Sequence, residues 1–240
     1  MKWKIYTFNQ VKSTNDVAKS YCQNTSGQYL VVQADTQISG RGRRGHVWVS
    51  LYGNLFFSIA LEFNLEKCGI LSLISSLSLL NVIKSLNSQA DVKLKWPNDV
   101  LLNGAKVSGI LLEKGPDNYI IIGIGVNIKE TPKIDNGLYK TTSLAATNIN
   151  VKALDFMQMY LLKFEENLCA FMENGAEFVV GRWLEYAKGL GNKIAIKNDF
   201  KEMKGIFFGL DEAGNLLLKI QDEVQTVLAG DIFILSDAND

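Results

Sequence analysis

The chain has 240 residues, a length that suits one sizeable core or a main domain with a small appendix. Hydrophobic residues make up 47% and charged residues 21%, an ordinary globular composition that excludes a disordered or fibrous protein. The 25 basic and 25 acidic side chains cancel, so no overall field favours nucleic acid or an acidic membrane surface.

Targeting signals and cysteines indicate where the protein works. The first six residues lack the apolar run and cleavage site of a secretory signal. The three cysteines are scattered and odd in number, which favours reduced thiols over a disulfide framework. We therefore expect a cytoplasmic protein.

The first half of the chain predicts alternating strands and helices. A strand at Trp3–Phe8 leads into a helix that begins near Ser13–Asp16, whose hydroxyl, amide and carboxylate groups suit a helix cap. Two further strands are expected at Tyr29–Ala34 and Leu55–Phe63, on either side of a polar, glycine-rich loop. The apolar stretch Gly69–Leu86 contains five serines, an asparagine and a lysine, so it predicts a core helix and no membrane contact.

The middle of the chain predicts a set of strands joined by tight turns. Val92–Trp96 has strand composition, and Asn103-Gly104 is typical of a two-residue hairpin turn. Strands at Lys106–Glu113 and Tyr119–Val126 are separated by the turn sequence Gly115–Asn118.

The last third predicts two helices followed by a small β domain. Helical periodicity covers Leu154–Met172 and Glu177–Ala187, and these helices can cover one face of the sheet. Short strands with intervening turns follow, at Lys193–Ile196, Gly205–Leu210, Leu216–Ile220, Val224–Leu228 and Ile232–Leu235. The prediction is an α+β fold, with a mixed β-sheet and helices packed on one face in a main domain at 1–188, plus a small C-terminal β-barrel domain at 189–240.

The segment Gly40–Gly45 has three glycines and three arginines and formally matches G-x-G-x-x-G. A dinucleotide site is excluded because that motif needs a helix directly afterwards, whereas Val47–Val49 has β-like residues. A solvated loop of ordinary charges is the alternative, but neighbouring arginines repel unless an anion neutralises them. Guanidinium groups hold carboxylate or phosphate oxygens in pairs of hydrogen bonds. The segment therefore predicts an anion-binding loop that orders when filled.

Two further motifs have both a structural and a functional interpretation. Lys95–Asp99 and Lys106–Ile110 can be a strand, a turn and a hairpin, or a carboxylate and an ammonium that bind a metal–nucleotide complex. Gly123–Asn127 can be a strand with glycine kinks, or bare backbone on which a flat ligand lies. His46 is the only histidine, so neither a catalytic triad nor a zinc site is supported.

Taken together, the motifs resemble the biotin–protein ligase family, and they occur in that family's order: Ser13–Asn15, Gln37–Gly45, Lys95–Asp99, Lys106–Gly109 and Gly123–Asn127. The resemblance covers essentially the whole chain and implies a biotin/lipoate ligase-like catalytic domain. It implies that biotin and ATP form biotinyl-adenylate and pyrophosphate. A lysine of a biotin carboxyl carrier protein or domain of a carboxylase then takes the biotinyl group.

The resemblance also implies roles for individual residues. Biotin would be bound by Ser13, Thr14, Asn15, Gln37, Gly40, Arg41, Gly42, Arg43, Lys106, Gly109, Leu111 and Gly123. ATP would be bound by Arg43, Arg44, Trp48, Asn98, Asp99, Lys106 and Asn127. Ser13, Thr14 and Gln37 would face the ureido ring, and Arg41 and Arg43 would order the loop around the carboxylate and the α-phosphate. Asp99 would lie by Mg²⁺, and Lys106, with Arg43, would stabilise the negative charge that grows in the transition state.

One departure from the family concerns DNA. Many relatives carry an N-terminal helix-turn-helix domain, whereas here the first strand begins at once, so we expect a short form with no operator binding, no nucleic-acid partner and no repressor activity. The sequence leaves open whether the chain forms a homodimer, which protein is the acceptor, what His46 does and what the C-terminal domain contributes.

Three other functions are compatible with parts of the sequence. A lipoate or octanoate protein ligase would share the catalytic fold, but the arginine loop and Lys95–Asp99 favour biotin. A nucleic-acid-binding protein could use the three arginines on phosphates, yet the aromatic and basic surroundings of such a site are thin. A biotin-binding protein without activity is disfavoured because Lys106 and Asp99 are both present.

Overall fold

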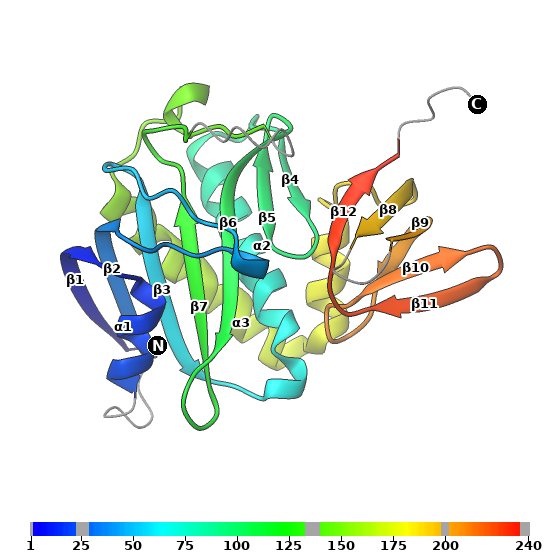
Figure 1. The fold of residues 1–240 in the computed structure, drawn as a ribbon, viewed down its shortest axis with the longest axis horizontal. Helices are drawn as coiled ribbons and strands as arrows, with labels where there is room; N and C mark the ends of the chain where they lie inside the picture. The colour runs from blue at the N-terminus through cyan, green and yellow to red at the C-terminus, as the bar shows by residue number, and fades with distance from the viewer. Residues whose placement is uncertain (1, 23–28, 133–139, 198–201, 236–240) are drawn as a thin grey trace.

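The computed structural model describes residues 2–22, 29–132, 140–197 and 202–235, and these form two β-sheets (Figure 1). The larger sheet contains β1 (Trp3–Val11), β2 (Tyr29–Gln37), β3 (Leu55–Glu62), β4 (Val92–Lys95), β5 (Asp99–Leu102), β6 (Ala105–Lys114) and β7 (Tyr119–Val126). Its strand order is β1-β2-β3-β7-β6-β5-β4, and only β1 and β2 pair in parallel within the described residues. The expected mixed sheet is confirmed.

The second sheet is antiparallel and has the order β11-β10-β9-β8-β12. Its strands are β8 (Lys193–Lys197), β9 (Glu202–Leu210), β10 (Leu216–Ile220), β11 (Glu223–Val227) and β12 (Asp231–Ile234). The five strands follow the five predicted segments, and β11 and β12 lie at opposite edges without a ladder between them in the part of the chain that the structure describes. The predicted division between residues 188 and 189 falls in the turns before β8 and stays a prediction.

Helices cover both faces of the larger sheet. On one face, α2 (Gly69–Leu86) and α3 (Ala153–Leu184) share the main core with apolar residues of the central strands. The short helix α1 (Thr14–Cys22) lies on the opposite face, where Ala18 packs in a second cluster with Leu30. The expectation of helices on one face therefore holds for the two long helices. On this face α1 contacts β2, β3 and β7.

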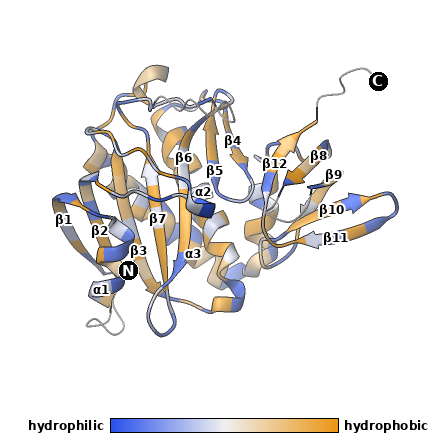
Figure 2. Cartoon of the chain, in the orientation of Figure 1, coloured by the Kyte–Doolittle hydropathy of each residue, from blue (hydrophilic) through white to orange (hydrophobic). Residues whose placement is uncertain are grey.

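The helix α2 is apolar on nearly all sides because it is enclosed between the sheet and α3. Among the described helices it is long and apolar enough to cross a membrane by length and composition, and 72% of it is buried within the protein. Figure 2 shows a contrast in hydropathy between the sheet and the loop: the central strands are largely hydrophobic, whereas the segment Arg43–Gly45 is strongly hydrophilic.

Glycine and asparagine residues lie where a helix is interrupted and where the chain turns between strands. The predicted pair of helices is confirmed within α3, which is divided at Gly175, whose φ of 81° and ψ of −177° are not helical. The predicted hairpin turn is confirmed, because Asn103 and Gly104 both have positive φ, 51° and 77°, as a type I′ turn requires. The short strand β5, which precedes this turn, was not predicted separately.

Candidate active site

A cavity of about 440 Å³ lies on the α1 face of the larger sheet and is lined in part by the loop that joins β2 to β3. Most of the predicted site residues line it: Ser13, Thr14, Asn15, Gln37, Arg41, Gly42, Arg43, Trp48, Asn98, Asp99, Lys106, Gly109, Leu111, Gly123 and Asn127. Gly40 and Arg44 do not line it. The structure therefore gathers segments that are more than 100 residues apart around one hollow.

Glycines on β6 and β7 form the floor of the cavity. A Cβ atom on Gly123 would collide with the amide of Asn15, and one on Gly125 would collide with the indole of Trp48. A Cβ on Gly109 would lie 2.8 Å from the Trp48 ring. The bare backbone predicted for this strand thus lets Asn15 and Trp48 lie directly against the sheet.

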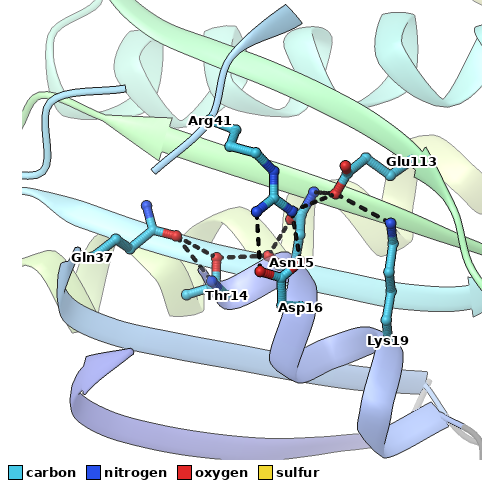
Figure 3. Close-up of polar contacts among 8 residues, drawn as sticks. Thr14, Asn15, Asp16, Lys19, Gln37, Arg41 and Glu113 are labelled. Atoms are coloured by element: carbon cyan, nitrogen blue, oxygen red, sulfur yellow. Dashed lines mark hydrogen bonds and ion pairs between the residues drawn. The ribbon is translucent and has the colours of Figure 1, made fainter. Parts of the chain in front are cut away.

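At the α1 end of the cavity, amide and hydroxyl groups form a continuous chain (Figure 3). Gln37 Oε1 accepts from the Thr14 backbone N–H at 2.9 Å and from the Thr14 hydroxyl at 3.1 Å. Ser58 Oγ lies 2.7 Å from Thr14 Oγ1 and 2.6 Å from Asn15 Oδ1. Asn15 Nδ2 donates to Glu113 Oε2 at 2.6 Å. We refer to Thr14, Asn15, Gln37 and Ser58 as the polar end of the cavity.

Arg41 connects the loop to this end. Its guanidinium forms two hydrogen bonds with Asp16, at 2.6 and 3.0 Å, and lies 3.4 Å from Glu113 (Figure 3). The hydrogen bond from Arg41 lowers the pKa of Asp16 below its usual 3.8, and the same contact raises the pKa of Arg41. Contact between Arg41 and a substrate carboxylate or phosphate stays a prediction; in the structure Arg41 is held by two protein carboxylates.

The other two arginines connect the loop to the C-terminal sheet. Arg44 Nη1 lies 3.0 Å from Asp231 Oδ2 and donates to the carbonyl of Lys197 at 3.1 Å. Arg43 Nη1 lies 3.5 Å from the carbonyl oxygen of Gly230, just before β12, and 3.5 Å from Asn98 Oδ1. The loop is therefore attached at one side to α1 and at the other to β8 and β12.

The charged side chains gather at the far end of the cavity, which we call the cationic end. Lys106 Nζ lies 2.6 Å from Asp99 Oδ1, a distance typical of an ion pair although the contact is not a well-aligned hydrogen bond, and 5.5 Å from the centre of the Trp48 ring. Burial lowers the pKa of Lys95 nearby. Trp48 Nε1 and Asn127 Oδ1 are buried without a hydrogen-bond partner among the described residues. Buried polar atoms are normally paired, so these two atoms point to a ligand.

The protein offers few ligands for a metal ion at the cationic end. The described residues contain no group of three or more His, Cys, Asp or Glu side chains that could hold one. Asp99 supplies a single carboxylate, and Mg²⁺ is commonly bound by one or two carboxylates together with substrate phosphates. Asp99 therefore fits an ion whose other ligands come from a nucleotide.

Sequence reasoning missed several residues of the site. Glu113 lies on the same face of β6 as the predicted Leu111, two positions away, so strand alternation was a usable signal. Ser58 is the only hydroxyl within the apolar strand β3. Asp231 and Phe233 also line the cavity, but they come from the C-terminal sheet, and no local pattern links them to it.

Comparison with known proteins gives the same picture over both sheets. Residues 7–127 match the Biotin/lipoate A/B protein ligase family, and residues 190–235 match the Biotin protein ligase C terminal domain. The chain is 32% identical over 232 residues to a biotin acetyl-CoA-carboxylase ligase of Paracoccus denitrificans, over 92% of this chain and 96% of that protein. It is 31% identical over 234 residues to the bifunctional ligase/repressor BirA of Bacillus subtilis, over 92% of this chain and 71% of that one. A solved biotin protein ligase from Aquifex aeolicus, in complex with biotin and ATP, has a TM-score of 0.80 and 28% identity, and the match covers 97% of this chain and 98% of that one.

Proposed function

The chain belongs to the biotin/lipoate A/B protein ligase family and is a biotin protein ligase, and on that basis we propose that it works through a biotinyl-adenylate. ATP and biotin would give biotinyl-adenylate and pyrophosphate, and a lysine of a biotin carboxyl carrier protein or domain would then accept the biotinyl group. One observation carries the proposal: a neutral polar end and a cationic end occupy the same cavity, under one loop.

The two steps follow from the chemistry of a carboxylate. A carboxylate oxygen of biotin attacks the α-phosphorus of ATP, and the bond to pyrophosphate breaks. The acceptor amine then attacks the acyl carbon, AMP leaves, and the amine loses a proton. The mixed anhydride is open to hydrolysis, so water must be excluded between the steps. Attachment of the loop to α1 through Arg41 and to β12 through Arg44 supports such shielding.

The polar end suits the ureido ring of biotin. Thr14 and Asn15 are each 3% exposed and offer hydroxyl and amide groups without a net charge. A neutral ring with both donors and acceptors is bound best by such groups, placed at a few fixed positions in a largely apolar pocket. Leu111 and Gly123 line the adjoining wall and would contact the apolar part of the ligand.

The cationic end suits ATP. Lys106 can move from Asp99 to the α-phosphate, where negative charge grows as the carboxylate attacks. Trp48 presents a ring on which adenine can stack, and the unpartnered Asn127 Oδ1 can accept from the adenine amino group. Asp99 would hold Mg²⁺ together with the phosphates, and the ion would neutralise phosphate charge.

The decisive experiment mixes the protein with ATP, Mg²⁺ and either biotin or lipoate, and measures pyrophosphate. We expect release with biotin alone. Adding a carrier domain should then increase its mass by one biotinyl group on a single lysine. Release that requires lipoate would replace the proposal with a lipoate ligase, and no release with either acid would reject an adenylating enzyme.

A cytoplasmic location and the absence of transcriptional repression stay predictions. The sequence is compatible with either a monomer or a homodimer. Sedimentation with and without biotin would distinguish the two.

A further inference from the structure

The connection between β4 and β5 brings two cavity residues to the cationic end. It consists of Trp96–Asn98, and both Asn98 and Asp99, the first residue of β5, line the cavity. The carbonyl of Pro97 accepts from Ser72 Oγ of α2 at 2.7 Å. Asn98 Nδ2 donates to a backbone carbonyl of β6 at 2.7 Å. The connection is therefore held by neighbouring elements of the main domain on two sides.

The third attachment of this connection comes from the C-terminal sheet. Trp96 is 2% exposed, and its indole N–H donates to the carbonyl of Gly214 at 2.9 Å. Gly214 lies in the turn between β9 and β10, 118 positions further along the chain. This hydrogen bond links the C-terminal sheet directly to the segment that carries Asn98 and Asp99.

The turn that offers this carbonyl is itself fixed by a side chain. Asp211 Oδ1 accepts from the backbone N–H of Ala213 at 3.0 Å and from that of Asn215 at 2.8 Å. Gly214, between these two residues, has a φ of 82°, which L side chains rarely adopt. The carbonyl that accepts from Trp96 thus belongs to a turn with a set conformation.

The same turn packs closely against the beginning of α2. A Cβ atom on Gly69, the first residue of α2, would collide with the carbonyl of Ala213. A Cβ on Gly214 would lie 3.3 Å from the backbone of Gly69. Contact between the two backbones leaves the turn little room to shift relative to α2, the helix that also holds Pro97.

The placement of Asp99 matters for the chemistry at the cationic end. Its carboxylate lies 2.6 Å from Lys106 Nζ, so a shift of the β4–β5 connection moves the partner of the proposed catalytic lysine. A misplacement of about 1 Å at a reacting centre can cost about 100-fold in rate. We propose that Trp96 is a positioning residue for adenylate formation, which holds Asn98 and Asp99 in place through its hydrogen bond to the turn Asp211–Asn215. The inference rests on the proposed function, because it takes the cationic end as the site of ATP.

A simpler role for Trp96 would be to stabilise the core, and a second tryptophan allows the two roles to be separated. Trp183 is 1% exposed, and its indole N–H donates to Ser76 Oγ at 2.9 Å. Both tryptophans belong to the main core, and neither Trp183 nor Ser76 lines the cavity. Loss of either indole N–H should therefore cost similar stability, whereas only Trp96 should affect the reaction.

Replacement of each tryptophan by phenylalanine keeps an aromatic ring and removes the N–H group. Trp96→Phe should lower kcat for biotin-dependent pyrophosphate release by about tenfold. Its biotin Kd, measured by calorimetry without ATP, should stay within about twofold of the parent's, because the polar end is untouched. Trp183→Phe should lower the melting temperature by a comparable amount and keep kcat within about twofold. Equal kcat values for the two variants, or a weakened biotin Kd in Trp96→Phe alone, would overturn the proposal.

Variants of Asp211 test the turn without a change in the core. Asp211→Ala removes the acceptor that fixes the turn and should lower kcat by about fivefold. Asp211→Asn keeps an acceptor oxygen and should restore kcat to within about twofold of the parent's. A loss as large as that of Asp211→Ala would assign the effect to charge and reject the role of the turn.

The double variant shows whether the two residues act through one contact. Trp96→Phe combined with Asp211→Ala should have a kcat within about twofold of that of Trp96→Phe alone. Factors that multiply would show that Trp96 acts independently of the turn, which would overturn the proposal.

Two further measurements keep the outcomes distinct. Melting temperatures identify variants that fail to fold, and if Trp96→Phe is among them, the Asp211 pair decides the question alone. Pyrophosphate release by the parent protein tests the proposed function separately. A parent that releases none with biotin fails both proposals, whereas an active parent with equal kcat values for the two phenylalanine variants fails only the role of Trp96.

Discussion

The two ends of the cavity are built on opposite principles. At the polar end, Thr14, Asn15, Gln37 and Ser58 bond to one another and to Glu113, so recognition groups are fixed by the protein itself. At the cationic end, charges dominate, and two buried atoms, Trp48 Nε1 and Asn127 Oδ1, have no partner among the described residues.

The difference matches the chemistry proposed for each end. A neutral ring that does not react is bound well by groups whose positions and directions are set in advance. A phosphoryl group whose charge changes needs mobile or compensating charges that strengthen in the transition state. Substitutions at the cationic end should therefore affect rate and nucleotide binding, and those at the polar end should affect biotin binding alone.

The largest expected effect comes from Lys106. Lys106→Ala should lower the rate of pyrophosphate release by about 10²- to 10³-fold, because one preorganised charge on the transition state is lost. The biotin Kd should stay within about twofold of the parent's, since the polar end is untouched. Rapid-quench assays and calorimetry measure the two quantities. Lys114→Ala, which changes an exposed lysine on the same strand, serves as control. Near-normal pyrophosphate release by Lys106→Ala would remove the distinction between the two ends of the cavity.

The next largest effect is expected from a methyl group added to the cavity floor, which should weaken ATP binding at the cationic end. Gly125→Ala places a Cβ 2.6 Å from Trp48 Nε1, so the indole must move from its position on β7. ATP binding at saturating biotin should weaken about tenfold if adenine stacks on this ring. Gly209→Ala in β9, where a Cβ meets nothing within 4 Å, is the control. An unchanged ATP Kd would reject Trp48 as the stacking surface.

Breaking the attachment of the loop to the C-terminal sheet should have a smaller effect, on retention of the biotinyl-adenylate. Arg44 and Asp231 form a partly exposed pair, with side chains 23% and 32% exposed, which limits its contribution to about 1 kcal/mol or less. Arg44→Ala and Asp231→Asn should each speed dissociation of the biotinyl-adenylate by about threefold. The double variant should be no faster than either single one. Dissociation at the parent's rate would show that the C-terminal sheet does not retain the intermediate.

Much of the fold was predictable because local chemistry decided it. The strand Tyr119–Val126 was predicted with its observed bounds, since its β-branched run begins directly after the Gly115–Asn118 turn. The helix Gly69–Leu86 was also predicted with its observed bounds, although its apolar character reflects burial on all sides more than a helical face. The predicted site residues largely meet in one cavity because their motifs follow strand ends and glycine-rich turns.

The connections between these motifs were not predictable from local pattern. Asn15 and Glu113 are 98 positions apart, and Arg44 and Asp231 are 187 apart, so tertiary packing alone brings them together. Arg41 shows most clearly what the local sequence pattern does not predict. Its loop composition indicated an anion, and the structure provides two, but they are the carboxylates of Asp16 and Glu113 in the protein itself.

The smallest expected effect is at that contact, and it tests whether charge matters at the polar end. Arg41 lowers the pKa of Asp16 below 3.8, so the pair stabilises the folded state when the pH is above the unfolded pKa. This contribution is lost as the pH falls through the lower folded pKa, below about 4. Asp16 is 48% exposed, so screening limits it to about 0.5 kcal/mol.

Asp16→Asn should therefore lower the free energy of unfolding slightly at pH 7, and this effect should shrink as the pH falls below 3.8, as urea denaturation can measure. Biotin affinity should be unchanged at pH 7, because the Glu113–Asn15 hydrogen bond at the polar end does not involve Asp16. A stability loss that stays constant as the pH falls below 3.8 would mean that the side chain acts through packing and not through its charge. A loss of biotin affinity would mean that loop attachment and ureido recognition are coupled, and the two ends would then no longer be separable.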